Sequence, residues 1–172
     1  LSSSNSKLRS NTIQAIFITK EGQLLAATDD GLFSKNENKE SLFSKGYDFT
    51  AIANNKGIIW VIADGEVLEM GKKGDLFETE FDERMFDGKP VDIDFDRKGN
   101  LWIASEVVVR YHFELESFDF FGPAEDFTSQ SVKCIAADSD GALWVGTENK
   151  GVFYIGKSSS LSGVVQVTEY LD

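Results

Sequence analysis

The sequence predicts an all-β chain of four repeats, each a four-stranded antiparallel sheet that forms one blade of a β-propeller. Short hydrophobic runs alternate with polar turn residues along the chain, and the apolar period of a helix is absent. A turn glycine recurs four times, and a tryptophan follows it at the same offset in three copies. Repeats of ~40–45 residues are typical of propellers, whereas β-solenoids usually have shorter repeats and sandwiches do not repeat their sequence.

The repeat becomes visible when the turn glycines are aligned, because they lie 35, 42 and 42 residues apart. Leu25 holds the place of the tryptophan in the first copy. Such agreement across four segments is hard to obtain by chance, so we interpret these glycines and tryptophans as structural residues of the repeat. They are Gly22, Gly57, Gly99, Gly141, Trp60, Trp102 and Trp144.

The alignment treats residues 1–172 as a single propeller region and divides it into four approximate blades. The blade ranges are 12–47, 48–88, 89–128 and 129–172. In the fourth blade, the hydrophobic runs predict strands at 132–137, 143–147, 151–155 and 164–170. Outer strands of the first three blades are expected near 40–44, 75–81 and 116–121.

The turn glycine and the tryptophan after it have separate physical roles. Glycine adopts positive φ without steric cost, so an Asp-Gly or Lys-Gly step closes a tight hairpin. A tryptophan buries ~150–250 Å², which is too much for one small sheet, so we expect each indole to lie between two sheets. Removing a large buried ring of this kind typically costs ~3–5 kcal/mol.

The composition excludes several classes of partner. The formal net charge of −12 argues against nucleic acid and against an anionic membrane surface, because both need clustered Lys and Arg. No apolar run approaches the ~20 residues that span a bilayer, so we expect no membrane insertion. Cys134 is the lone cysteine, which excludes an internal disulfide, and its place in an apolar run predicts a small buried residue. No glycine-rich phosphate loop occurs, and we expect no cofactor.

The stretch VDIDFDRKGN places three carboxylates, Asp92, Asp94 and Asp96, at alternate positions. On a strand they would share one face, and the innermost strand of a propeller blade lines the central channel. One interpretation is a site for a cation or polar ligand, although the glycine and terminal glutamate of a calcium loop are misplaced. The interpretation that we favour is an acidic, solvated channel wall or an exposed edge, without a metal.

Aromatic residues gather around the Gly122-Pro123 step, which predicts a loop after a strand. Tyr111, Phe120 and Phe121 are the candidates for stacking against a sugar ring. The structural alternative is that these rings cover the gap between adjacent blades.

Catalysis is not expected. A Ser–His–Asp triad would have to use His112, the only histidine, and no Gly-x-Ser-x-Gly motif occurs in the chain. A zinc site built from Cys and His would have only Cys134 and His112. The sequence therefore predicts a protein without catalytic residues.

The segment SVKCIAADSDGALWVGTENKGVFYI, residues 131–155, resembles the two-component-regulator propeller repeat. That motif reads as an apolar strand, then Asp-x-x-Gly-x-Leu-Trp-x-Gly-Thr, then Gly-apolar-aromatic. The third copy also matches, and the first two copies are weaker. The motif residues of the third copy are Asp96, Gly99, Leu101, Trp102 and Ser105. In that family the repeats commonly build the periplasmic or otherwise extracytoplasmic sensory region of hybrid histidine kinases in Bacteroidetes-type bacteria.

The resemblance implies a non-catalytic binding module in signal transduction, located outside the cytoplasm, because many regions of that family are thought to sense glycan fragments. The partner would be a glycan or another small ligand. A second function that fits the resemblance is a protein-interaction scaffold in a bacterial envelope or secretion assembly. A third, which we place last, is a propeller lyase, because streptogramin lyases have a similar Gly-x-x-Trp blade pattern.

The number of repeats leaves three arrangements open. Closed propellers use ~4–8 blades, so four repeats lie at the lower limit. We expect part of a larger propeller. The other arrangements are a half-ring that associates with itself or a protein partner through open blade faces, and a closed ring of four blades.

Overall fold

The computed structural model describes residues 2–4, 6–81, 83–86, 88–122, 132–156 and 164–167. The chain forms two compact units, Leu1–Phe81 and Asp82–Asp172. Each unit contains two four-stranded antiparallel sheets in which consecutive strands pair. The one helical segment in the described ranges is a 3₁₀ turn, η1 (Glu83–Met85). The predicted all-β fold of four propeller-type blades is therefore confirmed.

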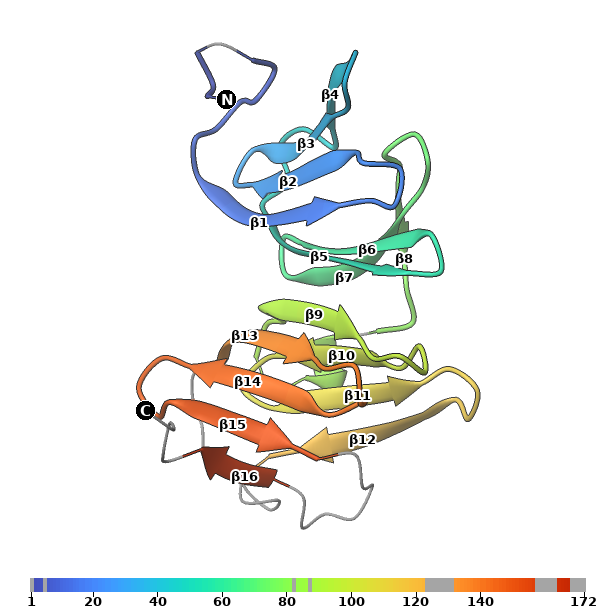
Figure 1. Cartoon of the computed structure of the whole chain (residues 1–172), viewed down its shortest axis with the longest axis vertical. Helices are drawn as coiled ribbons and strands as arrows, with labels where there is room; N and C mark the ends of the chain where they lie inside the picture. The colour runs from blue at the N-terminus through green and yellow to red at the C-terminus, as the bar shows by residue number, and fades with distance from the viewer. Residues whose placement is uncertain are drawn as a thin grey trace. The chain divides into compact units, whose positions relative to one another are not determined.

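Unit 1 contains blades 1 and 2 (Figure 1). Blade 1 consists of β1 (Ile13–Ile18), β2 (Leu24–Thr28), β3 (Gly31–Lys35) and β4 (Glu40–Phe43). Blade 2 consists of β5 (Phe49–Asn55), β6 (Ile58–Ala63), β7 (Glu66–Met70) and β8 (Leu76–Glu78). Strand β8 is shorter than predicted, and Thr79 after it donates its hydroxyl to the carbonyl of Val67 at 2.6 Å.

Unit 2 contains blades 3 and 4 (Figure 1). Blade 3 consists of β9 (Asp92–Phe95), β10 (Leu101–Ala104), β11 (Val108–His112) and β12 (Ser117–Phe121). Blade 4 consists of β13 (Val132–Ala137), β14 (Leu143–Thr147), β15 (Val152–Ile155) and β16 (Val164–Val167). The stretch around Gly122-Pro123 begins directly after β12, and residues 123–131, with Phe127 among them, lie outside the described residues.

The turn glycines close the first hairpin of every blade, as predicted. The φ angles of Gly22, Gly57, Gly99 and Gly141 are 77°, 91°, 83° and 84°. A Cβ on Gly141 would meet no heavy atom within 4 Å, so the left-handed backbone, and not a lack of space, favours glycine there. The Asp138 carboxylate completes the same turn by accepting hydrogen bonds from the backbone N–H groups of Asp140 at 2.8 Å and Ala142 at 3.0 Å.

A hydroxyl after the tryptophan position closes the second hairpin. The hydroxyls of Thr28, Ser105 and Thr147 donate to backbone carbonyls at the start of the next strand, over 2.6, 3.0 and 2.8 Å. The accepting residues are Gly31, Val107 and Gly151. The recurrence of Thr or Ser in the sequence thus has a local cause, because this hydroxyl satisfies a carbonyl at a tight turn.

The core of unit 1 lies between the facing sides of blades 1 and 2. Its fully buried members come from the middle strands, with Phe49 at the start of β5. They are Leu25, Ala27, Leu32, Phe49, Val61, Ala63 and Leu68. On the opposite side of blade 1, Leu8 from the N-terminal segment packs on Ala26 and Phe33.

The core of unit 2 lies between blades 3 and 4. Trp102 pairs across strands with Asp94 and Arg110, so these side chains share the face of blade 3 that meets blade 4. The buried side chains of this core are Trp102, Ala104, Val108, Phe121, Val132, Ile135, Leu143, Val145, Phe153 and Ile155. Trp102 is fully buried between the two sheets, as predicted. Trp60 of blade 2 is also buried, with its ring centroid 5.8 Å from that of Phe81.

Two expectations for blade 4 are wrong. Trp144 does not lie between two sheets: 40% of it is exposed, because it points to the side of blade 4 opposite the core. Cys134 is exposed, not buried, because it shares that outer side with Trp144. The sequence pattern predicts an apolar environment for both residues. In the structure, no described sheet of unit 2 covers this side of blade 4.

Candidate functional site

A groove between blades 1 and 2 is a concave site of unit 1 with an apolar floor. Its volume is about 300 Å³. It lies where three hairpin turns meet, those of β1–β2, β5–β6 and β7–β8. The lining residues are Thr19, Lys20, Glu21, Gln23, Leu25, Phe43, Asn54, Gly57, Ile59, Met70, Gly71 and Lys72. We call this the turn groove.

The turn groove has an apolar floor and a polar rim. Leu25 and Phe43 come from blade 1, and Ile59 and Met70 from blade 2, and all four belong to the apolar cluster of unit 1 or pack on it. The rim carries two ammonium groups, one carboxylate and two amide side chains. An apolar surface with a few convergent polar groups is the usual composition of a ligand site.

Hydrogen bonds to a neighbouring strand and within a hairpin turn hold the two amides of the rim in place. Gln23 donates its side-chain N–H to the hydroxyl of Ser34 at 2.5 Å. Asn54 accepts from the backbone N–H of Gly57 at 3.4 Å and donates to the carbonyl of Ile58 at 3.2 Å. These amides are therefore positioned before any ligand binds, which lowers the entropy cost of binding.

Charge in the turn groove is positive in balance. Lys20 and Lys72 face it together with Glu21. The pKa of Glu21 lies below its ordinary value, mainly because a backbone N–H donates to its carboxylate, with the Thr19 hydroxyl second. Glu21 is thus ionised at neutral pH, and the two lysines outnumber it.

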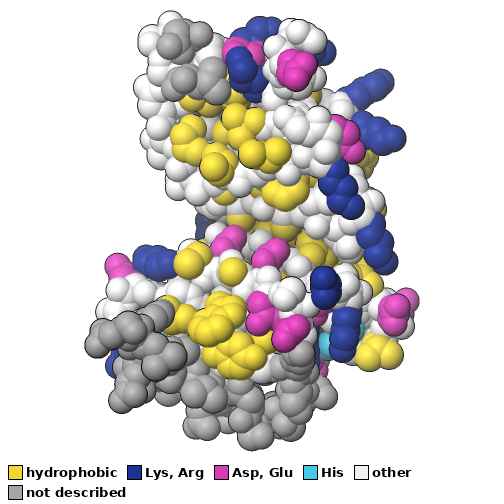
Figure 2. Space-filling view, in the orientation of Figure 1, with side chains coloured by type: hydrophobic (Ala, Val, Ile, Leu, Met, Phe, Trp, Pro, Cys, Tyr) yellow, Lys and Arg dark blue, Asp and Glu magenta, His cyan; other side chains and the backbone are white. Residues whose placement is uncertain are grey.

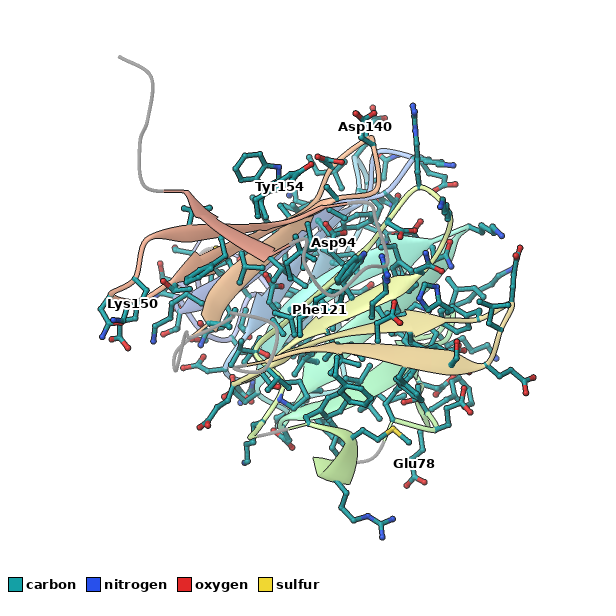
Figure 3. The ribbon with its side chains drawn as sticks, turned by 90° about the horizontal axis from the view of Figure 1, so that it is seen from below. Glu78, Asp94, Phe121, Asp140, Lys150 and Tyr154 are labelled. Atoms are coloured by element: carbon teal, nitrogen blue, oxygen red, sulfur yellow. The ribbon has the colours of Figure 1, made fainter. Side chains whose placement is uncertain are left out.

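The predicted carboxylate row on blade 3 has a structural partner. Asp92 accepts a hydrogen bond from the backbone N–H of Ile135 at 2.8 Å, and Asp94 accepts one from Ala137 at 2.8 Å. Both donors belong to β13, so the two carboxylates join blade 3 to blade 4; Figure 3 shows Asp94 pointing toward that sheet. They do not form a solvated channel wall, since both are partly buried.

Burial raises the pKa values of Asp92 and Asp94. Loss of hydration raises the pKa of Asp92 to about 6, although N–H donation from Ile135 and Ile93 acts in the opposite direction. The pKa of Asp94 is also raised, mainly by burial. Among the described residues, no group of three His, Cys, Asp or Glu side chains is arranged to hold a metal ion.

The third carboxylate, Asp96, begins a chain of polar contacts within blade 3. Asn100 donates its amide N–H to Asp96 at 2.7 Å and presents its amide oxygen to His112 Nδ1 at 3.1 Å. His112 Nε2 lies 2.8 Å from Asp119 Oδ2. Arg110 donates its Nε–H to the same oxygen at 2.9 Å. The single histidine is therefore held between two oxygen atoms inside the blade.

Arg110 is a charged group within the core of unit 2. It is buried, and its guanidinium carbon lies 4.9 Å from the ring centroid of Trp102 and 5.7 Å from that of Phe121. Burial raises the pKa of Asp119, but hydrogen bonds from His112 and Arg110 outweigh this and hold it below the ordinary value. This cluster stabilises the blade 3–blade 4 core through cation–π and ion-pair contacts.

The predicted aromatic residues separate onto the two faces of blade 3. Phe121 is buried against Trp102, with ring centroids 5.6 Å apart, and Figure 3 shows it inside unit 2. Tyr111 is buried on the other face, where its ring centroid lies 4.8 Å from that of Phe113 and 4.7 Å from that of Phe118. Phe120 is 49% exposed and is the only one of the three predicted rings on the surface.

Sequence reasoning missed the turn groove and the Arg110–Asp119–His112 cluster. Two of the three turns of the groove contain repeat glycines, Gly22 and Gly57, which could have placed them at the same end of adjacent blades. The cavity itself depends on side-chain volumes that no repeat pattern encodes. For the cluster, the alternation of Arg110 with His112 on one strand was the available signal.

Comparison with known families connects the fold to a class of proteins. The family model described as Two component regulator propeller matches residues 126–149, which include β13, β14 and the turn between them. The expected resemblance is thereby confirmed, and the chain carries a repeat of this family. A comparison of the sequence with curated proteins finds no match.

Solved structures with the same fold include extracellular domains from B. thetaiotaomicron and a lyase. The extracellular domain of a B. thetaiotaomicron protein described as the hybrid two component system BT3049 aligns with a TM-score of 0.71 and 18% identity, over 91% of this chain and 23% of that chain. The extracellular domain of BT4673 from the same organism, described as a one component system, aligns with a TM-score of 0.70 and 19% identity, over 90% of this chain and 22% of that chain. Virginiamycin B lyase from Staphylococcus aureus aligns with a TM-score of 0.64 and 16% identity, over 88% of this chain and 58% of that chain.

These similarities show the fold, and this chain spans less than a quarter of the length of the two B. thetaiotaomicron domains. In the described residues, no helix is long and apolar enough to cross a membrane.

Proposed function

We propose that this chain, which carries the two-component-regulator propeller repeat, is a non-catalytic ligand-binding module of a bacterial extracytoplasmic sensor. The repeat match at residues 126–149 carries the proposal. It is supported by the likeness in fold to extracellular domains of B. thetaiotaomicron hybrid two component systems. Sensing in such a module means binding a ligand and passing the change to an output domain.

The turn groove is the binding site in this proposal. Its volume of about 300 Å³ lies at the small end of the ~300–1,000 Å³ range of ligand pockets. The Phe43 ring and the aliphatic floor suit the apolar face of a sugar ring, and the amides of Gln23 and Asn54 suit hydroxyl groups. Lys20 and Lys72 favour a carboxylate on the ligand. The ligand class is therefore a short glycan that contains an acidic sugar.

The contacts of His112 support a non-catalytic role. Both ring nitrogens already face oxygen atoms of Asn100 and Asp119 within blade 3. A general base needs a nitrogen within reach of the proton that it takes from a substrate. A lyase function would need His112 to leave this arrangement, and nothing in the geometry favours that.

A glycan array with neutral and uronic-acid-containing oligosaccharides tests the proposed function. We expect retention of acidic oligosaccharides, and titration calorimetry of the strongest one should give a dissociation constant that weakens about tenfold or more in the Lys72→Glu variant. Lys133→Glu is the matched control, because Lys133 belongs to unit 2 and does not line the groove, and its charge changes equally. Binding of no oligosaccharide on the array would favour the scaffold function. Equal loss of affinity in the two variants would rule out the turn groove as the binding site.

A further inference from the structure

We propose that the outer side of blade 4 docks on the outer side of blade 1 of a second copy of this chain, so that two chains join head to tail. This inference does not depend on the ligand-binding function. The Trp144 face consists of Cys134, Ala136, Trp144, Gly146 and Tyr154. The Ile16 face consists of Ile16, Ile18, Leu24, Ala26 and Phe33.

Unit 2 already contains one such joint. The face of blade 3 that carries Trp102 packs on the face of blade 4 that carries Ile135 and Phe153. This joint buries Trp102 completely. This joint is therefore a structural template for the kind of sheet face that packs on a blade face with a tryptophan.

The Trp144 face is the register equivalent of the Trp102 face. Trp144 pairs with Ala136 and Tyr154 across strands, as Trp102 pairs with Asp94 and Arg110. Figure 3 shows Tyr154 pointing away from the rest of unit 2, and the Trp144 and Tyr154 rings lie 5.0 Å apart edge to face. Cys134 and Ala136 of blade 4 stand at the positions of Asp92 and Asp94 in blade 3, so the Trp144 face is more apolar than the Trp102 face.

The Ile16 face is the register equivalent of the side of blade 4 that packs on Trp102. Ile16 pairs with Ala26, which pairs with Phe33; in blade 4, Ile135 and Phe153 flank Val145 in the same way. Ile16 is 69% exposed and Ile18 is 65% exposed, whereas Ile135 is buried in its joint. Figure 2 shows hydrophobic side chains gathered over β1 and also over β14 and β15.

The N-terminal segment leaves the inner half of the Ile16 face open. Leu8 packs on Ala26 and Phe33 over β2 and β3, and an ion pair between Arg9 and Asp30 at 2.7 Å holds the next residue. Ile16 and Ile18 on the innermost strand are not in this cluster. The second copy is therefore expected to dock on β1, with Leu8 beside the joint.

A head-to-tail joint is favoured over a joint of two like faces. Each head-to-tail joint covers one Trp144 face and one Ile16 face. A joint of two Trp144 faces would leave both Ile16 faces in water, which is less favourable by the area of exposed apolar surface.

Sedimentation equilibrium tests the proposal on the whole chain in buffers of rising salt, because a net charge of −12 opposes association at low salt. We expect association into species of at least twice 19.1 kDa, with an association constant that falls by roughly tenfold or more in Trp144→Glu and in Ile16→Glu. An equal mixture of the two variants restores one joint and so recovers a dimer. Leu115→Glu, which changes an exposed leucine outside both faces, leaves the wild-type affinity unchanged.

Cys134 gives a second readout, because it is the lone cysteine and lies on the Trp144 face. Its reaction with a thiol reagent should become slower as the chain associates and should be at least several-fold faster in Ile16→Glu than in the associated wild type, with the folded state of each variant checked by circular dichroism. A monomer whose thiol reacts freely contradicts the proposal. A monomer with a protected thiol, or an Ile16→Glu variant that still dimerises, also overturns it.

Discussion

The carboxylate of Asp92 accepts a hydrogen bond from the backbone N–H of Ile135, 2.8 Å away on the neighbouring blade. Asp94 repeats this contact two residues later with Ala137. The two donors lie on β13, the innermost strand of blade 4, at alternate positions whose N–H groups would otherwise lack a partner on that edge. A row of carboxylates on one blade thus satisfies the open edge of the next.

Replacing Asp92 by Asn should remove the part of the acid-range pH dependence of unit 2 that this carboxyl supplies. The folded pKa of Asp92, about 6, lies above its ordinary value of 3.8, so its stabilising contribution is fully present below pH 3.8 and is lost as the pH rises through about 6. Asp94 acts with the same sign. The free energy of unfolding of the wild type should therefore fall by roughly 1–3 kcal/mol between about pH 4 and pH 6.5.

In Asp92→Asn this fall should be much smaller, because a neutral amide oxygen still accepts from Ile135. Urea unfolding at a series of pH values measures it. Asp140→Asn, which removes a charge from the exposed β13–β14 turn, is the control and should keep the wild-type pH profile. If Asp92→Asn and the control have the same profile, the carboxylate is not the titrating group.

Replacing Asp119 by Asn should destabilise unit 2 by roughly 2 kcal/mol at pH 7, because it leaves the buried Arg110 without its carboxylate. The value is below that of a fully buried pair, since the carboxylate is partly exposed. The pKa of Asp119 is lowered, so its contribution is present above pH 3.8 and is lost as the pH falls below that value. The effect of the substitution should therefore shrink in strong acid.

Thermal unfolding at pH 7 and at pH 3 measures this difference. Asp140→Asn again serves as the control for the loss of one charge. An Asp119→Asn variant as stable as the wild type at pH 7 would mean that Arg110 is satisfied by the Trp102 and Phe121 rings alone.

Replacing Gly141 by Ala should cost ~1–2 kcal/mol, because alanine disfavours a φ of 84° although the space around it is open. Gly141→Asn should cost less, since asparagine tolerates the left-handed region. The opposite order in denaturant midpoints would show that space, and not backbone conformation, selects the glycine.

Trp102→Ala and Trp144→Ala should differ strongly in a monomeric sample at low concentration. Trp102 is completely buried between blades 3 and 4, so its loss should cost ~3–5 kcal/mol. Trp144 is 40% exposed, so its loss should cost clearly less. Equal costs would mean that a further sheet covers Trp144 in solution.

The repeat pattern was sufficient to predict the blades, and the reason is local. Gly141 and Thr147 each satisfy a requirement of a hairpin turn, so sequence spacing reports strand spacing directly. The alternation of Asp92 with Asp94 also predicted a shared face correctly. What faces them could not be predicted, because the N–H groups of Ile135 and Ala137 come from a strand 43 residues away.

The predictions that Trp144 and Cys134 are buried were wrong for a related reason. The sequence context of Trp144 equals that of Trp102, which is buried in blade 3, and only a neighbouring sheet distinguishes the two tryptophans. Cys134 lies in an apolar run but on the same uncovered side as Trp144. The turn groove was missed because it belongs to no single repeat: Phe43 and Met70 reach it from different blades.

Hydrogen–deuterium exchange with the acidic oligosaccharide retained most strongly on the array tests the central claim most directly. The account predicts slower exchange in three turns of unit 1, at residues 19–23, 54–57 and 70–72, because these line the turn groove. Unit 2 should exchange at the same rate with and without the oligosaccharide. Protection confined to residues 111–120, around Tyr111 and Phe120, would contradict the account and place the ligand on the aromatic surface of blade 3.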